Sequence, residues 1–201
     1  MLDDIKKYNI ILASQSPRRV ELMRELGLNF IQVKLSDIDE SYPSDLNKNE
    51  IPAYIARKKS DSYTQKLNDN DILITVDTIV WCNGEMFGKP KDKNDAHRML
   101  SAISNNTHEV LSGVCLRSTA KIRSFVTTST VQFKAFSDDE IDFYINNYNP
   151  YDKAGAYGIQ EWIGYTGLIK IEGSYFNVMG LPSQNLYSEL EMFISNSNCL
   201  L

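Results

Sequence analysis

Disulfide bridges, zinc clusters and membrane spans each require residues that this chain has little of. Its 201 residues include three cysteines and two histidines, and none of these stand at the spacing of a Cys or His metal site. The cysteines lie far apart, so we expect reduced thiols rather than a disulfide framework. No apolar run reaches the ~18 residues of a membrane span, and the acidic N-terminus does not resemble a secretory signal. We therefore expect a cytoplasmic protein with no membrane partner.

Positive charge is also scarce, because 21 Lys and Arg face 26 Asp and Glu for a net charge of −5. A nucleic-acid partner is not expected, since such proteins show a basic patch or stripe. No G-x-S-x-G turn is present, which argues against a serine hydrolase of that type. In an acidic chain, any local cluster of Lys or Arg becomes informative. The remaining composition, 42% hydrophobic and 23% charged, is that of a globular protein of one domain or two small lobes.

A strand, a tight turn and a helix are predicted for the first 27 residues. The apolar run Ile10 to Ala13 is typical of a buried strand, and a helical apolar pattern follows. Ser16 is placed to be the N-cap of that helix and Pro17 its first residue, where a missing N–H costs nothing. Gly27 is the expected stop.

Two arginines, Arg18 and Arg19, stand in the first turn of this helix. Cations are disfavoured there by roughly 0.3–1 kcal/mol each. Together with the hydroxyls of Ser14 and Ser16, they suit a bound anion, and phosphate matches the guanidinium fork best. The alternative is an arginine pair on a solvated helix face, and spacing alone leaves both open.

Two acidic features could belong to one site. Asp77 interrupts the apolar run 71–81, which is typical of a central strand. Such an Asp is either a structural residue satisfied by backbone N–H groups or a metal ligand or general base at the end of a strand. The second feature is the acidic loop 36–41, which includes Glu40. It is either solvated or bridged by a cation, and metal binding there would need a carboxylate from elsewhere.

Lysines occur at two further places of interest. The predicted helix 50–67 carries Lys58 and Lys59, of which one could face a cleft and the other water. Lys89 lies between Gly88 and Pro90 after a predicted hairpin at Asn83-Gly84. The flanking Gly and Pro indicate a positioned cation.

The rest of the chain alternates between helices, strands and glycine-bracketed loops. We predict a helix at 94–104, strands at 110–117 and 122–136, a helix opened by a capping box at Ser137, a loop at 148–158, a strand at 167–172, a loop at 173–182, and a final helix from Ser183 to about Ile194 with a frayed tail from about 195.

Seven motifs in this order resemble the Maf family over nearly the whole chain. They are Ser14 to Arg19, Asp39-Glu40, Ala56 to Lys59, Asp77-Thr78, Gly88-Lys89-Pro90, Asp152 to Gln160, and Gly173 to Pro182. The Ala-Gly-Ala-Tyr-Gly-Ile-Gln form is similar to that of the family's dTTP/UTP pyrophosphatase branch. The resemblance implies one α/β domain over 1–201, two-lobed around a central cleft, with a long mixed sheet flanked by helices as in the inosine-triphosphate pyrophosphatases.

The resemblance also implies an activity and a set of residues. The activity is metal-dependent hydrolysis of a nucleoside triphosphate, dTTP, UTP or a related pyrimidine nucleotide, to the monophosphate and pyrophosphate, with Mg²⁺ or Mn²⁺. The implied roles are catalysis for Asp77, metal binding for Glu40 and Asp77, and substrate binding for Ser14, Ser16, Arg18, Arg19, Lys59, Lys89 and Gln160.

Two departures from the family pattern lie in the substrate loop. Glu161 stands where the family usually has Gly, and Asn147-Tyr148-Asn149 replaces a usual Thr-Gly-Glu. Both departures therefore bear on base preference rather than on the reaction. Two other functions stay open: a non-catalytic nucleotide-binding regulator of cell division or septum formation, and a phosphatase that releases orthophosphate. Asp77 together with Glu40 favours the enzyme. A homodimer is compatible with the sequence, which does not specify the oligomeric state.

Overall fold

The computed structural model describes residues 2–36 and 38–195. The strands in this part of the chain are β1 (Asn9–Ala13), β2 (Phe30–Val33), β3 (Asp71–Cys82), β4 (Glu85–Phe87), β5 (Thr107–Arg117), β6 (Ile122–Phe133) and β7 (Leu168–Glu172). The α-helices are α1 (Leu2–Ile5), α2 (Pro17–Glu25), α3 (Ile51–Asp61), α4 (Lys93–Ile103), α5 (Asp138–Tyr148), α6 (Trp162–Gly167), α7 (Tyr175–Val178) and α8 (Ser183–Ser195). Two 3₁₀ turns, η1 (Pro150–Asp152) and η2 (Ala154–Ala156), follow α5.

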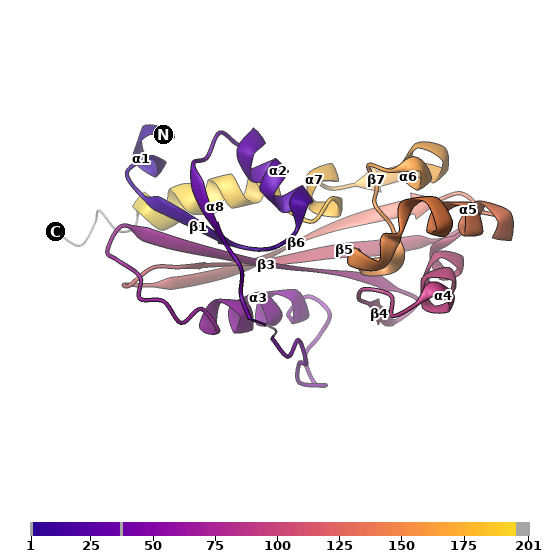
Figure 1. Ribbon diagram of the computed structural model, residues 1–201, viewed down its shortest axis with the longest axis horizontal. Helices are drawn as coiled ribbons and strands as arrows, with labels where there is room; N and C mark the ends of the chain where they lie inside the picture. Colours follow the sequence, from indigo (N-terminus) through magenta and orange to yellow (C-terminus); the bar gives the residue numbers. More distant parts are fainter. Residues whose placement is uncertain (1, 37, 196–201) are drawn as a thin grey trace. The chain divides into compact units, whose positions relative to one another are not determined.

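The strands described form one seven-stranded mixed sheet in the order β2-β1-β3-β5-β6-β7, with β4 paired to β3 (Figure 1). β1 runs parallel to β2 and β3, whereas β4 and β7 run antiparallel to β3 and β6. The predicted mixed α/β class with a long sheet is therefore confirmed. None of the described helices is long and apolar enough to cross a bilayer.

The chain divides into two compact units. Unit 1 contains Met1–Asp77, Ser112–Thr127 and Gly180–Leu201, and unit 2 contains Thr78–Leu111 and Thr128–Met179. Each boundary falls inside a strand or loop, so β3, β5 and β6 contribute residues to both units.

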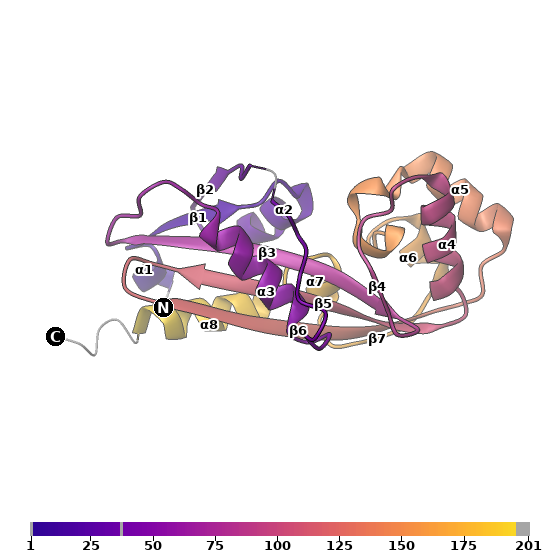
Figure 2. The same ribbon diagram turned by 90° about the horizontal axis from the view of Figure 1, so that it is seen from below.

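In unit 1, α3 and α8 lie on opposite faces of the strands (Figures 1 and 2). The predicted helix 50–67 ends earlier, at Asp61. Tyr63 and Leu67 instead pack with residues of β1 and β3 in a small apolar cluster, and the guanidinium of Arg117 binds the carbonyls of Ser60 and Tyr63. The apolar side chains thus gain more from tertiary burial than from another helical turn.

α3 also approaches β5 closely enough to require a glycine. A Cβ added to Gly113 would lie 2.1 Å from the carbonyl carbon of Pro52, at the start of α3. Backbone atoms cannot move aside as a flexible side chain can, so no other residue fits there. This contact brings the first turn of α3 directly against the sheet.

In unit 2, α4 and α5 pack side by side over a large apolar cluster (Figure 2). α4 buries Ala96, Met99, Leu100 and Ile103 on one face, and α5 begins with the predicted capping box at Ser137, which pairs with Glu140. α7 lies inside the loop predicted at 173–182, since it has only four residues and glycines flank it. α6 lies in a segment for which no element was predicted. The final helix begins at Ser183, as predicted, and the described part of it ends at Ser195. The predicted frayed tail falls largely outside the described residues.

Candidate active site

The turn between β1 and α2 is closed by Ser14. This side chain is buried, and its Oγ accepts hydrogen bonds from the backbone N–H of Ser16 at 3.2 Å and from Arg19 Nη1 at 3.4 Å. Ser16 is the N-cap residue and Pro17 the first residue of α2, as predicted. The hydroxyl of Ser16, however, makes no capping hydrogen bond. α2 therefore lacks the side-chain cap that usually serves the N–H groups of a first turn.

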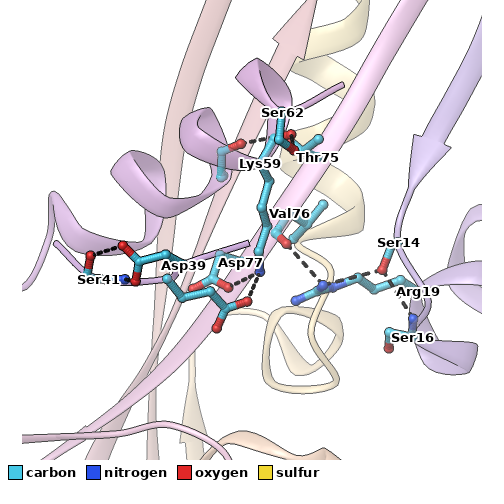
Figure 3. Close-up of polar contacts among 12 residues, drawn as sticks. Ser14, Ser16, Arg19, Asp39, Ser41, Lys59, Ser62, Thr75, Val76 and Asp77 are labelled. Atoms are coloured by element: carbon cyan, nitrogen blue, oxygen red, sulfur yellow. Dashed lines mark hydrogen bonds and ion pairs between the residues drawn. The ribbon is translucent and has the colours of Figure 1, made fainter. Parts of the chain in front are cut away.

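Arg19 joins three segments of unit 1. Its Nε donates to the carbonyl of Gly180 at 2.8 Å. Its Nη1 also donates to the carbonyl of Val76 at 3.1 Å (Figure 3). Burial lowers the pKa of Arg19 to about 10, against the opposing effect of the Asp77 carboxylate, so the side chain stays charged at neutral pH. Because Val76 precedes Asp77, Arg19 helps to hold that part of β3 in place.

Lys59 lies between two carboxylates. Its Nζ is 2.6 Å from Asp77 Oδ1 (Figure 3). The same Nζ is 2.8 Å from Glu40 Oε1. The side chain of Asp77 is 10% exposed and that of Glu40 is 53% exposed. α3 is held against β3 by the Thr75 hydroxyl, which donates to the carbonyl of Ala56 at 2.6 Å. One buried and one open carboxylate therefore meet at a single cation.

The neighbouring lysine, Lys58, also contacts the acidic loop, where it pairs with the exposed Asp39. Lys58 Nζ lies 3.1 Å from Asp39 Oδ2 and 3.1 Å from the carbonyl of Ser41. Hydrogen bonds from Ser41 and the Lys58 ammonium lower the pKa of Asp39 to about 2. Both lysines of α3 thus contact the acidic loop, so neither simply faces water. Asp37 of this loop lies outside the described residues.

A divalent cation suits the chemistry of this donor set. Asp77 and Glu40 already share one cation, the ammonium of Lys59. Mg²⁺ is commonly bound through one or two carboxylates, with phosphate oxygens and waters completing its shell. Within residues 2–36 and 38–195, no group of three or more Cys, His, Asp or Glu is placed to hold a metal. A metal here would therefore depend on the substrate for further ligands.

Unit 2 contains the two other predicted substrate ligands. Lys89 is exposed, and the carbonyl of its neighbour Gly88 accepts a hydrogen bond from the N–H of Gly155 at 3.0 Å. Gln160 is half-buried, and its Oε1 is buried with no hydrogen-bond partner among the described residues. Five of the predicted site residues come together within unit 1: Ser14, Arg19, Lys59, Asp77 and Glu40. Lys89 and Gln160 belong to unit 2. Arg18 lies half-exposed on α2.

Sequence reasoning missed several groups that support this site. The acceptors of Arg19 are the backbone carbonyls of Val76 and Gly180, and no side-chain pattern marks a carbonyl. Thr75 carries a detectable signal, because a hydroxyl in an otherwise apolar strand needs a partner. Lys153 and Glu161 form a buried ion pair in unit 2, which the sequence signalled only as a departure at Glu161.

The fold resembles that of a solved HAM1 protein from Coxiella burnetii, with a TM-score of 0.50 and 16% identity over 94% of this chain and 99% of that one. At that identity the likeness concerns the fold alone. The chain belongs to the Maf family, because residues 9–193 match the model described as "Maf-like protein". The family suggested by the seven motifs is therefore confirmed.

Curated relatives cover almost the full length. A dTTP/UTP pyrophosphatase of Bacteroides thetaiotaomicron is 51% identical over 191 residues, which are 95% of this chain and 99% of that protein. A dTTP/UTP pyrophosphatase of Porphyromonas gingivalis is 49% identical over 195 residues, covering 96% and 98%. Another, from Flavobacterium johnsoniae, is 45% identical over 192 residues, covering 96% and 98%.

Proposed function

We propose that this protein hydrolyses nucleoside triphosphates to the monophosphate and pyrophosphate, with dTTP and UTP as preferred substrates. Membership of the Maf family and the names of three relatives at 45–51% identity support this reaction. The observation that carries the proposal is the meeting of Asp77 and Glu40 at one ammonium, Lys59 Nζ. Binding alone does not require two carboxylates beside a polyphosphate, whereas hydrolysis requires a group that accepts the proton of water.

Asp77 and Glu40 would hold a divalent cation, Mg²⁺ or Mn²⁺. Such an ion, when bound, would polarise phosphate oxygens and lower the pKa of a coordinated water. Glu40 is the more open of the two carboxylates, so it can turn toward a ligand at little cost. Asp77 is held in position by Lys59 on one side and by the fixed carbonyl of Val76 before it.

Asp77 would accept the proton of the water that attacks the α-phosphorus, directly or through a second water. Lys59, which pairs with Asp77, and the two arginines of α2, Arg18 and Arg19, would balance the negative charge of the triphosphate. Phosphoryl-type transfer depends mainly on positioning and charge stabilisation. Pyrophosphate would leave toward the N-terminus of α2, where Ser14 and Ser16 lie and the helix dipole favours an anion.

Lys89 and Gln160 are proposed as substrate ligands from unit 2. The buried Oε1 of Gln160 is an acceptor that has no partner among the residues described. Thymine and uracil both present an N3–H donor, whereas N3 of cytosine is an acceptor. A carboxamide oxygen placed opposite N3 would favour thymine and uracil, because the N3 of cytosine would leave that acceptor unpaired.

The test is a panel of the eight common ribo- and deoxyribonucleoside triphosphates, each with Mg²⁺, with Mn²⁺ and with EDTA. We expect monophosphate and pyrophosphate in equal amounts, fastest from dTTP and UTP, and none with EDTA. Orthophosphate as the first inorganic product would indicate a phosphatase. Nucleotide-dependent thermal stabilisation without any hydrolysis would indicate a non-catalytic regulator. Either result would refute the proposal.

A further inference from the structure

Glu161 occupies a position where its residue type is unexpected. It is the N-cap of α6, yet its side chain makes no capping hydrogen bond. Ser, Thr, Asp or Asn would serve that position better. The Glu161 side chain instead bonds to groups that precede it in the chain, Lys153 and Tyr144. The identity of this residue is therefore explained by tertiary contacts rather than by the helix it precedes.

The first partner is a buried lysine. The Lys153 side chain is 8% exposed, and its Nζ lies 3.1 Å from Glu161 Oε1 and 2.9 Å from Asp152 Oδ1. Asp152 is 54% exposed, whereas Glu161 is 20% exposed. A buried ammonium is strongly destabilising when its partner is removed. Glu161 is thus the shielded counter-ion of Lys153, and the ion pair fixes the two ends of the segment 153–161.

The second partner is the hydroxyl of Tyr144, on α5. It donates to Glu161 Oε2 and accepts a hydrogen bond from the backbone N–H of Gly158 at 2.9 Å. The ring of Tyr144 stacks on that of Tyr148, with centroids 5.1 Å apart. Tyr148 and Glu161 belong to the two departures from the usual family pattern, so both departures meet at one side chain.

Gln160 shares its space with Glu161. A Cβ at Gly158 would lie 2.8 Å from the Glu161 carboxyl carbon and 3.1 Å from Gln160 Nε2. Because Gly158 has no side chain, those of Glu161 and Gln160 can both lie close to its backbone. A change in how Glu161 lies would alter the room available to the Gln160 carboxamide, whose Oε1 is buried.

We infer that Glu161 is a positioning residue for base selection. Held between Lys153 and Tyr144, its carboxylate fixes the segment 153–161 and thereby the carboxamide of Gln160. This inference rests on the proposed function, because it assumes that Gln160 contacts the base. It adds a residue that does not touch the substrate yet determines how strongly thymine and uracil are preferred over cytosine.

The experiment compares kcat and KM for dTTP, UTP and dCTP in the wild-type protein and in Glu161→Gln. The amide keeps the size of the side chain and removes the charge that pairs with Lys153. We expect the ratio of kcat/KM for dTTP to that for dCTP to fall at least fivefold. Most of the change should appear in KM for dTTP, because the base lies away from the reacting phosphorus.

The matched control is Glu172→Gln. Glu172 pairs with Lys170 at 3.0 Å, close to the Lys153–Glu161 distance, but both side chains are more than 60% exposed. Exposed pairs contribute little, so the selectivity ratio should stay within twofold of wild type. Equal falls in both variants would refute the inference, because the effect would then not depend on the buried pair.

A purely structural role for Glu161 predicts a different result. It would lower the melting temperature and leave the selectivity ratio unchanged, and that outcome overturns the inference. If Glu161→Gln does not fold, Tyr144→Phe removes only the hydroxyl and keeps the Lys153 pair. An unchanged ratio in that variant is equally decisive, whereas a two- to fivefold fall supports the inference.

The proposed function and this inference fail in distinguishable ways. A wild-type protein that releases no pyrophosphate from any nucleotide refutes the function and removes the premise of the inference. A wild-type protein that releases pyrophosphate, with an unaltered ratio in the folded Glu161 and Tyr144 variants, refutes the inference alone.

Discussion

The two units each contain a lysine paired with one open and one shielded carboxylate, but the carboxylates are held differently. In unit 1, Lys59 joins Asp77, which is 10% exposed, to Glu40, which is 53% exposed and belongs to a separate loop. In unit 2, Lys153 joins Glu161, which is 20% exposed, to its chain neighbour Asp152, which is 54% exposed, and the Tyr144 hydroxyl also donates to Glu161. Glu40 can turn from Lys59 toward a ligand, whereas Glu161 is bound by two groups and a buried charge that loses its partner is costly. The same ionic chemistry thus suits turnover in unit 1 and positioning in unit 2.

The largest effect should come from the carboxylate at the centre of unit 1. Asp77→Asn should lower kcat about 10³-fold for every nucleotide, since an amide cannot accept the proton that general base catalysis requires. The ratio between dTTP and dCTP should not change. Pyrophosphate release measured at matched protein concentration checks this, and nucleotide-dependent thermal stabilisation verifies that the variant still binds. Retained turnover would remove Asp77 from its proposed role.

A buried histidine in unit 2 should make the stability of the protein depend on pH. His108 is 2% exposed, its Nε2 lies 2.7 Å from the Tyr157 hydroxyl, and burial lowers its pKa to about 4 from 6.5. Below pH 6.5 the unfolded chain binds this proton and the folded protein does not, so stability falls as the pH drops from 6.5 toward 4. The loss should reach roughly 3 kcal/mol.

Urea midpoints between pH 7.5 and pH 4 measure this loss. His108→Leu should be less stable at pH 7.5, because it gives up the Tyr157 hydrogen bond, but its midpoint should vary less across the interval. A variant that follows the wild-type profile would show that another group causes the pH dependence.

Replacing Arg18 should mainly affect substrate binding, whereas replacing Arg19 should also affect the stability of unit 1. Arg19→Ala removes the donor to the Gly180 and Val76 carbonyls and should cost about 1–3 kcal/mol of stability as well as activity. Arg18→Ala should raise KM and lower kcat roughly tenfold, with a smaller change in stability. Thermal melts alongside steady-state kinetics distinguish the two. Equal melting temperatures in both variants would contradict the structural role of Arg19.

The smallest effect should come from Lys58. Its partner Asp39 is 73% exposed, and exposed ion pairs contribute little. Lys58→Ala should therefore change kcat/KM less than twofold, whereas Lys59→Ala should reduce it by at least tenfold. Comparable losses would mean that the exposed Lys58–Asp39 pair also controls Glu40, and would contradict the assignment of the site to Lys59 alone.

Much of the fold was predictable because local patterns and tertiary packing agree. The strand around Asp77, the capping box at Ser137 and the helix predicted at 94–104 each form as the sequence indicates. The family was recognisable because seven short motifs occur in order. These signals all depend on residue type and spacing, which a sequence displays directly.

The features that the sequence did not predict depend on contacts between segments that are distant in the chain. α3 ends early because Tyr63 and Leu67 find apolar partners on strands, and periodicity within 50–67 does not record this. Lys59 was predicted to bind phosphate, and its phosphate contact stays a prediction, although the structure shows the two carboxylates that orient it. The pairing of Glu161 with Lys153 and Tyr144 likewise requires knowing which side chains a loop brings together.

The close approach of Pro52 to Gly113 has a consequence for how this protein can change over time. Every single-nucleotide replacement of a glycine codon that encodes another residue adds at least a Cβ, and here that atom would overlap backbone. No compensating side-chain exchange nearby can relieve an overlap with the main chain. A saturation library at position 113, selected for folded protein, should return glycine alone. We therefore expect position 113 to stay glycine during evolution, even if the substrate preference of the protein changes.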